Sequence, residues 1–168
     1  MIYLEKFNQT HYSELINSIS DARELMQFAG PEFMFPLTEG QIKKSLSDIN
    51  RIAFRVVNAS NGSTIGHCEI YFTDDFAKLG RILIMDKTQR GKGFGEQIVK
   101  LLLDFISKNR KQTKVELNVF DFNVNAIKCY EKAGFVINPD KKLIRKVEDE
   151  SWIVLNMILD LENRIKKN

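Results

Sequence analysis

The chain has 168 residues and a formal net charge of +3, and 43% of its residues are hydrophobic and 28% charged. This size and balance predict a single globular domain over residues 1–168 with a core of its own, and the small charge gives no indication of nucleic-acid binding. No apolar run approaches the length that spans a bilayer, and the N-terminus lacks the basic and then apolar pattern of a secretion signal. We therefore expect a cytoplasmic protein without membrane contact.

Metal-ligating residues are few. Cys68 and Cys129 are the only cysteines, and His11 and His67 are the only histidines. None of them has companions at the short spacing of metal ligands, so we expect reduced structural thiols and no metal site. The basic stretch at residues 164–167 is a candidate contact for an acidic partner or, more simply, a solvated chain end.

The first part of the chain predicts one strand and two short helices. Residues 2–7 alternate loosely in hydropathy, which is typical of a strand. Thr10 and Asp21 are the expected N-caps of the two helices, and Gly30 ends the second one.

An apolar loop and an antiparallel meander follow. Residues 33–37 are apolar yet flanked by prolines, which predicts a loop that either packs on the core or lines a substrate pocket. Thr38 and Gln41 have the spacing of a capping box for a helix to about residue 48. Three strands are then expected, at residues 52–57, 64–72 and 77–85. The Asn61-Gly62 pair between the first two of these is typical of a hairpin turn.

A glycine-rich turn, Arg90-Gly91-Lys92-Gly93-Phe94-Gly95, comes directly after the third of these strands. Apolar residues at helical spacing follow it over residues 96–109. The first turn of a helix has unpaired N–H groups and a partial positive charge, to which Arg90 and Lys92 add. This predicts a phosphate or pyrophosphate site, with a plain turn as the alternative. The spacing fits neither a Walker A loop nor a dinucleotide fingerprint.

The second half predicts a parallel strand pair. Residues 114–120 alternate cleanly, and a strand, a helix and a strand in sequence imply a right-handed crossover beside residues 77–85. Asn123 is the expected cap of another helix, which Gly134 ends. The last strands are expected at residues 135–137, 143–147 and 152–159, the final two as a hairpin. The whole pattern predicts a mixed α/β fold.

Two motifs give the chain a resemblance to the GNAT superfamily of N-acetyltransferases, particularly the bacterial branch that includes the ribosomal-protein acetylases. The glycine-rich turn matches the family's Gln/Arg-x-x-Gly-x-Gly/Ala loop, and Asn123-x-x-Ala126-x-x-x-Tyr130-x-x-x-Gly134-Phe135 matches the second signature. The order of expected elements agrees over nearly the whole chain. The resemblance implies a central, mostly antiparallel sheet with one splayed parallel strand pair, flanked by helices.

The resemblance also implies a reaction. Acetyl-coenzyme A would donate its acetyl group to a primary amine of a small molecule or peptide, which attacks the thioester directly. A non-catalytic module that senses acyl-coenzyme A is the alternative function. By position, the cofactor-binding residues would be Leu83, Ile84, Met85, Arg90, Gly91, Lys92, Gly93, Phe94, Gly95, Glu96, Asn123 and Tyr130.

The same resemblance implies catalytic roles. Tyr130 takes the family's general-acid position, the alternative being a ring that fills space between helix and sheet. The glutamate of ribosomal-protein acetylases, five residues before the motif asparagine, is replaced here by Asn118. We therefore expect Glu69 to be the general base, although Glu116 is near and an amine of low pKa needs no base. The final hairpin with Trp152 is a candidate for pairing across a homodimer.

Overall fold

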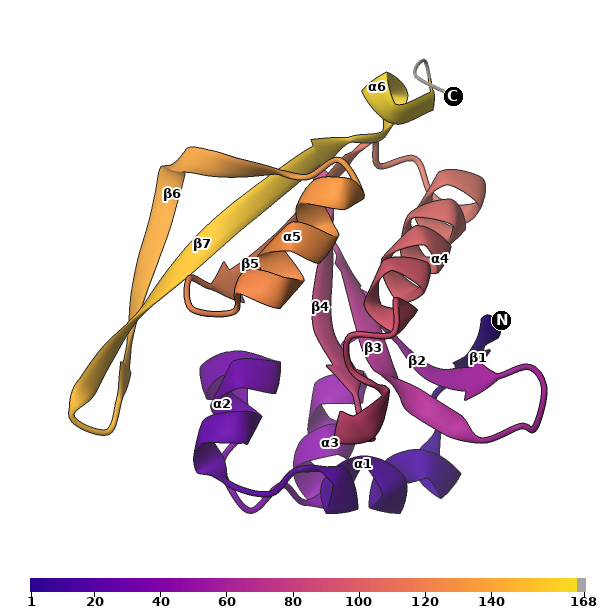
Figure 1. Cartoon of the computed structure of the whole chain (residues 1–168), viewed down its shortest axis with the longest axis vertical. Helices are drawn as coiled ribbons and strands as arrows, with labels where there is room; N and C mark the ends of the chain where they lie inside the picture. The colour runs from indigo at the N-terminus through magenta and orange to yellow at the C-terminus, as the bar shows by residue number, and fades with distance from the viewer. Residues whose placement is uncertain (166–168) are drawn as a thin grey trace.

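The computed structural model describes residues 1–165, with side chains described to residue 163, so the basic stretch 164–167 lies outside the described side chains. Seven strands form one mixed sheet in the order β1-β2-β3-β4-β5-β7-β6 (Figure 1). The strands are β1 (Ile2–Lys6), β2 (Arg51–Asn58), β3 (Thr64–Phe72), β4 (Phe76–Ile84), β5 (Lys114–Phe120), β6 (Val136–Val147) and β7 (Glu150–Asp160). The expected mixed fold is confirmed, since β4 and β5 are parallel and all other neighbours are antiparallel.

Six α-helices and three short 3-10 helices connect the strands in the described chain. The α-helices are α1 (Tyr12–Ser18), α2 (Ala22–Ala29), α3 (Glu39–Leu46), α4 (Phe94–Asn109), α5 (Val124–Lys132) and α6 (Leu161–Ile165). The 3-10 helices are η1 (Gln9–His11), η2 (Gly30–Glu32) and η3 (Lys87–Gln89). None of the helices in this described part is long and apolar enough to cross a membrane.

The helices build separate cores on the two faces of the sheet. α4 buries Ile98, Val99, Leu102, Leu103 and Ile106 in the main core, which draws on every strand except β6. α1, α2 and α3 form a second core with Ala53 and Leu83 of the sheet. In Figure 1 these three helices gather at one end of the molecule, while the β6–β7 hairpin extends as an arm on one side.

The parallel strands separate soon after they meet. β4 and β5 pair only from Phe76 with Lys114 to Leu79 with Leu117. Beyond that point β4 contains a bulge, where Arg81 and Ile82 together oppose a single residue of β3. A bulge bends its strand and increases the local twist. The opening between β4 and β5 that results, here called the splay, is visible in Figure 1.

The bulge has an unusual backbone. Arg81 has a φ of 49°, in the left-handed region that non-glycine residues rarely adopt. On the neighbouring strand, a Cβ at Gly66 would lie only 2.0 Å from the carbonyl oxygen of Leu83. The close approach of β3 and β4 therefore requires glycine at this position.

Most local expectations agree with the structure, with two corrections. The strands expected at residues 135–137 and 143–147 are one strand, β6, whose pairing with β7 shifts register between Ile137 and Lys142. Asp21 and Thr38 cap α2 and α3, because their side chains accept hydrogen bonds from the N–H groups of Glu24 and Gln41. The expectation that Thr10 caps the first helix is wrong. Asn8, two residues earlier, caps the 3-10 helix η1 by accepting the Thr10 N–H at 2.9 Å, and α1 follows η1 without a side-chain cap of its own.

The apolar segment 33–37 is a loop, as expected, and packs on the core. Phe33 and Leu37 are buried in the second core, whereas Met34 and Phe35 are exposed. The cavities described below are not lined by residues 33–37. This favours the packing role over the pocket role for the loop.

Candidate active site

The glycine-rich turn leaves the start of α4 open. Gly91 and Gly93 have φ angles of 78° and 81°, and no atom lies within 4 Å of where a Cβ would stand on either. No side chain caps α4, and Gln97 makes the first bond of the helix to the carbonyl oxygen of Gly93 at 3.2 Å. The N–H groups of the first turn are thus left without helical partners, an arrangement that suits an anion.

The charged side chains near this turn already have partners. The Arg90 guanidinium donates from Nε to the carbonyl oxygen of Ile84 at 3.1 Å and lies 3.3 Å from Glu24. Glu96 pairs with Lys132 at 2.6 Å. These contacts join the turn to β4, α2 and α5.

Gly95 has a packing role. A Cβ on Gly95 would stand 3.4 Å from Cys129 Sγ, so its small size lets α4 approach α5.

A cavity of about 600 Å³ connects the turn to the splay, and we call it the donor cavity. Most of the residues expected to bind a cofactor line it: Leu83, Ile84, Arg90, Gly91, Gly93, Gly95, Glu96, Asn123 and Tyr130. Met85, Lys92 and Phe94, which were also expected there, do not line this cavity.

The backbone of β4 explains why Met85 is absent from the donor cavity. The Met85 N–H donates to the carbonyl oxygen of Ile65 on β3 at 3.0 Å. Because bonding directions alternate along an antiparallel strand, the peptide groups of Ile84 point away from β3 and toward the splay. Of the three residues expected to bind through their backbone, Ile84 is thus the one best directed toward the splay, with its N–H facing the opening and its carbonyl oxygen accepting from Arg90.

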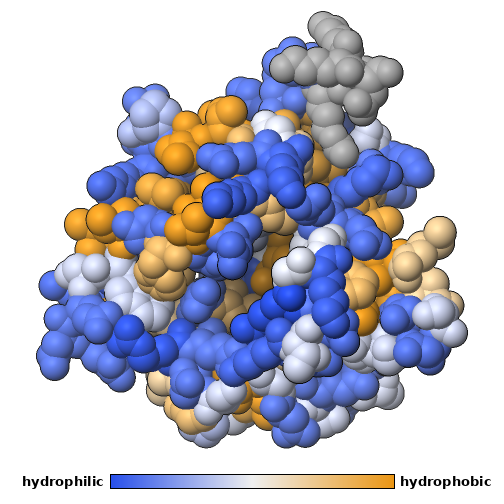
Figure 2. All heavy atoms as spheres, viewed as in Figure 1, coloured by the Kyte–Doolittle hydropathy of each residue, from blue (hydrophilic) through white to orange (hydrophobic). Residues whose placement is uncertain are grey.

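A second cavity, of about 620 Å³, lies on the other side of the splay, and we call it the acceptor cavity. It shares five residues with the donor cavity: Gln27, Phe28, Ile82, Asn123 and Tyr130. Figure 2 shows a hollow near the middle of this face with a mainly hydrophilic rim. The two cavities therefore meet at a common wall, where β4 bends away from β5.

Tyr130 is part of this common wall. Its side chain is half-buried, and its ring lies 6.2 Å from that of Phe135. Burial raises the pKa of the Tyr130 hydroxyl well above its ordinary value, so the group stays protonated at neutral pH. The helix that carries it begins at Asn123, whose Oδ1 accepts the Ala126 N–H at 3.4 Å.

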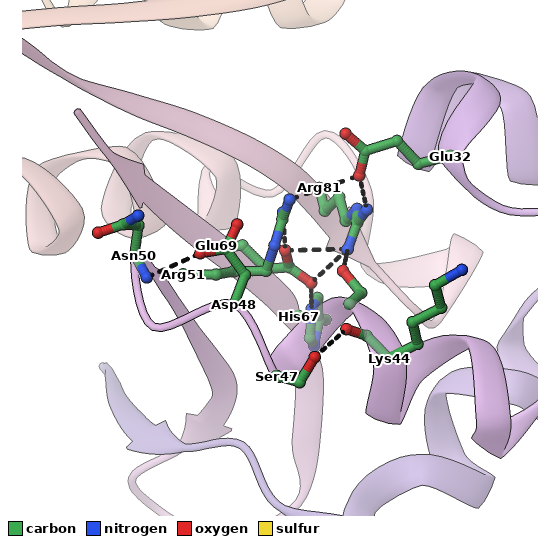
Figure 3. Close-up of polar contacts among 10 residues, drawn as sticks. Glu32, Lys44, Ser47, Asp48, Asn50, Arg51, His67, Glu69 and Arg81 are labelled. Atoms are coloured by element: carbon green, nitrogen blue, oxygen red, sulfur yellow. Dashed lines mark hydrogen bonds and ion pairs between the residues drawn. The ribbon is translucent and has the colours of Figure 1, made fainter.

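Glu69 lies in a buried network of charged residues, shown in Figure 3. Its carboxylate contacts Arg51 at 2.7 Å, Arg81 at 3.1 Å and His67 Nε2 at 3.0 Å. Arg81 also contacts Glu32 of η2. Burial alone would raise the pKa of Glu69, but His67 and the two arginines lower it to about 2.

This network corrects the role expected of Glu69. A carboxylate with a pKa of about 2 has little affinity for a proton at neutral pH, and both of its oxygens are already engaged. Glu69 lines the acceptor cavity, but its surroundings suit a structural anion and not a general base.

Asn118, which stands where the ribosomal-protein acetylases have a glutamate, uses its side-chain amide in hydrogen bonds. The Asn118 side chain lies 2.9 Å from that of Asn156 and, with its oxygen turned toward Lys78, accepts from Lys78 Nζ at 3.2 Å. Glu116, the nearby alternative, is paired with Lys141 at 3.1 Å.

Sequence reasoning missed Arg81, Lys78 and Arg145, which also line the acceptor cavity. The available signal was a charged residue within the apolar run of β4, around Arg81. In the described chain, no three His, Cys, Asp or Glu side chains are placed to hold a metal ion.

A splayed parallel strand pair, an uncapped glycine-rich helix start and two cavities that meet between them define an acyl-transfer type of site. The chain belongs to the acetyltransferase (GNAT) family, whose sequence profile matches residues 21–135. The resemblance that the two motifs indicated is thus confirmed at the level of the family.

Curated relatives share about half of their length with the chain. Aminoglycoside N(6')-acetyltransferase type 1 from Klebsiella pneumoniae is 30% identical over 105 residues, covering 52% of this chain and 52% of the relative. Spermine/spermidine N(1)-acetyltransferase from Bacillus subtilis (strain 168) is 30% identical over 69 residues, covering 39% of this chain and 45% of the relative.

Solved structures agree with the fold over nearly the whole chain. The crystal structure of spermidine N-acetyltransferase from Vibrio cholerae in complex with CoA and spermine has a TM-score of 0.79 and covers 98% of each chain. Its sequence identity is 22%, so the likeness concerns the fold alone.

Proposed function

We propose that the protein transfers the acetyl group of acetyl-coenzyme A to a primary amine. The observation that carries this proposal is the common wall of the donor and acceptor cavities at Ile82 and Tyr130. A two-substrate transfer needs two sites whose reactive ends meet, and the splay is where the two cavities meet.

The chain's own residues fit coenzyme A. The N–H groups of the open first turn of α4, together with Gly91 and Gly93, suit its pyrophosphate. The peptide groups of Ile84 are directed toward the splay and suit an amide-bearing arm. When bound, acetyl-coenzyme A supplies the activated thioester.

The residues at the wall then have separate tasks. Tyr130 donates its hydroxyl proton to the departing sulfur, since its hydroxyl is protonated at neutral pH and its side chain lines both cavities at the common wall. A backbone N–H of β4 near Ile84 donates to the carbonyl oxygen that gains charge. Because the lowered pKa of Glu69 gives its carboxylate little affinity for a proton, the amine loses its proton to water in the acceptor cavity.

The names of the relatives indicate which classes of acceptor to test. They are named for aminoglycosides and for spermine or spermidine, and the sequence resembles the ribosomal-protein acetylases, so small amines and peptide amines are the classes to compare.

The homodimer expected from the final hairpin would have to use the outer edge of β6. Trp152 is only 7% exposed and packs within the chain against Phe120 and Phe122. It is therefore not available at a surface, whereas Ile144 of β6 is exposed.

Thiol release from acetyl-coenzyme A across a panel of amines tests the proposed function. We expect release that depends on the amine, with product mass increased by one acetyl group. Reactions without an amine measure hydrolysis. Tight binding of acetyl-coenzyme A with no amine-dependent release would contradict the enzyme and favour the sensor module.

A further inference from the structure

The acceptor cavity contains more positive than negative side chains. Five cationic residues line it, Arg51, Lys78, Arg81, Lys141 and Arg145, against four carboxylates, Glu32, Asp48, Glu69 and Glu116. A purely cationic acceptor would gain from a surplus of carboxylates, and the balance here is the opposite.

The carboxylates are largely engaged within the protein. Glu69 and Glu32 contact Arg51 and Arg81. Glu116 pairs with Lys141 at 3.1 Å. The remaining carboxylate, Asp48, accepts the backbone N–H of Asn50 at 3.0 Å. Among the described carboxylates of this cavity, Asp48 is thus the one without a cation partner, against two unpaired cations, which leaves positive charge in excess.

Two of the five cations that line the acceptor cavity form no ion pair with a carboxylate of the described residues. Lys78 Nζ donates to the turned amide oxygen of Asn118 at 3.2 Å, and no ion pair joins Lys78 to a described acid within 4 Å. Arg145 is half-buried on β6, and no ion pair or hydrogen bond joins its side chain to the described residues.

These two cations lie close enough to influence one another. Burial lowers the pKa of Lys78. Glu116 and Glu32 oppose this effect, and the positive charges of Lys141 and Arg145 add to it. A group of cations this close together is stabilised by an added anion. The arrangement therefore favours an anionic ligand at this end of the cavity.

The location separates this group from the reacting end. Lys78 precedes Ile82 of the common wall by four residues, which is at most roughly 13 Å of chain, and the bulge at Arg81 and Ile82 shortens this span. An acceptor whose amine reaches Ile82 and Tyr130 would place its other end near Lys78 and Arg145.

We propose that the acceptor is a primary amine that also carries an anionic group, a carboxylate or a phosphate, which Lys78 and Arg145 bind. This inference rests on the proposed acetyl transfer and narrows its substrate class. An acceptor of this kind would differ from aminoglycosides and from spermine or spermidine, the amines for which the relatives are named.

A matched set of six-carbon amines tests the proposal with the wild-type protein. The set is hexylamine, 1,6-diaminohexane, 6-aminohexanoate and 6-aminohexyl phosphate, with four- and eight-carbon versions to cover the span. We expect kcat/KM for an anionic amine to exceed that for the diamine by at least about 10-fold, the scale of one charge-assisted hydrogen bond. The carboxylate and phosphate arms show which anion is preferred.

Variants of Arg145 on β6 test its assigned role in binding the anionic group. In Arg145→Gln, the ratio of kcat/KM for the anionic amine to that for hexylamine should fall about 10- to 100-fold, mainly through KM. Arg145→Lys should keep most of the ratio, and Arg145→Glu should shift the preference toward the diamine. Lys142→Gln is the matched control, because Lys142 is an exposed neighbour on the same strand that does not line the cavity.

The outcomes separate the two proposals. A wild-type preference for the diamine, or a ratio that Arg145→Gln leaves unchanged, would overturn the anionic acceptor while acetyl transfer stands. Transfer to none of the amines would overturn both. A melting curve on each variant shows that a changed ratio does not come from unfolded protein.

Discussion

At the scale of single residues, Tyr130 offers a test in which one oxygen atom is removed. Tyr130→Phe keeps the ring that packs near Phe135 and deletes the proton. Because coenzyme A thiolate is a fairly good leaving group, we expect kcat to fall by about 10²-fold, the lower end of general-acid contributions. Cofactor affinity and melting temperature should change little.

A ring that only fills space would behave differently. It would give a Phe variant with normal kcat and an Ala variant with a large loss of stability. Tyr3→Phe on β1 is the control, since Tyr3 lies outside both cavities. Steady-state kinetics and melting curves on the three variants distinguish the two roles.

Glu69 leads to a prediction about stability and pH. Its pKa is about 2 in the folded protein against an ordinary value of 4.5. The ionised carboxylate therefore stabilises the fold fully above pH 4.5, and this contribution is lost as the pH falls through about 2. The shift corresponds to about 3 kcal/mol at neutral pH. We expect Glu69→Gln to lower the free energy of unfolding by about this amount at pH 7.

Urea titrations between pH 7 and pH 2 provide the measurement. The difference between wild type and Glu69→Gln should be constant above pH 4.5 and shrink below it. Glu148→Gln is the control, because Glu148 forms an exposed pair with Arg23 and should change stability by less than about 1 kcal/mol. A Glu69→Gln effect independent of pH would show that the buried network does not hold the carboxylate ionised.

The site residues differ in how far the sequence could specify them. Tyr130 and the glycines belong to local motifs, so the family resemblance carried by those motifs was enough to expect them at a cofactor site. The role of Glu69 depends on Arg51 of β2 and Arg81 of β4, which come from other strands. Strand alternation shows the face on which a side chain lies but not which distant charges meet it, so the sequence did not indicate the ion pairs that argue against Glu69 as the base.

At the scale of elements, the turn before α4 contains a test of anion binding. Gly93 and Gly62 have similar φ angles of 81° and 72°, and neither has an atom within 4 Å of a Cβ position. Valine at either site should therefore bring a comparable backbone strain, at least about 1–2 kcal/mol. We expect Gly93→Val alone to weaken coenzyme A binding, by about 10-fold or more, through lost N–H contacts.

Calorimetric titration with coenzyme A measures this difference. Gly62→Val, in the distant β2–β3 turn, should lose stability without losing affinity. Equal affinities for the two variants would place the pyrophosphate elsewhere.

The close approach of β3 and β4 excludes any side chain at Gly66. Because a Cβ at Gly66 would stand 2.0 Å from a backbone oxygen, Gly66→Ala must push the strands apart. We expect a loss of about 3 kcal/mol or more in unfolding free energy. Gly80→Ala on β4, where no atom lies within 4 Å of the added Cβ, should change it by less than about 1 kcal/mol. Similar losses in both variants would show that the close approach is not what Gly66 provides.

Elements were more predictable than the irregularities that shape the site. Hydropathy period and turn residues located the strands and α4, because both signals are local. The bulge at Arg81 and Ile82 left no such signal, since it arises where β4 must pair with β3 and leave β5. Asn8 was overlooked as a cap because η1 separates it from α1.

At the scale of the whole molecule, the expected single domain becomes a prediction about cooperativity. Trp152 is the only tryptophan, and it lies in a small cluster with Phe120, Val147 and Val154 beside the β6–β7 arm. Its fluorescence therefore reports on the arm, whereas far-UV circular dichroism reports on the whole chain.

The packing of β7 argues that the arm does not unfold by itself. β7 pairs with the whole of β5, from Asp160 with Lys114 to Val154 with Phe120, and it contributes Met157 and Leu159 to the main core. We therefore expect the two probes to give coincident urea transitions, as for a two-state domain. Coenzyme A at 100 times its Kd should raise both midpoints together, adding about 2.7 kcal/mol of stability. Gly93→Val serves as the control, because a 10-fold weaker affinity at the same ligand concentration cuts the added stability to about 1.4 kcal/mol. A fluorescence midpoint at lower urea would instead identify the arm as a separate folding unit.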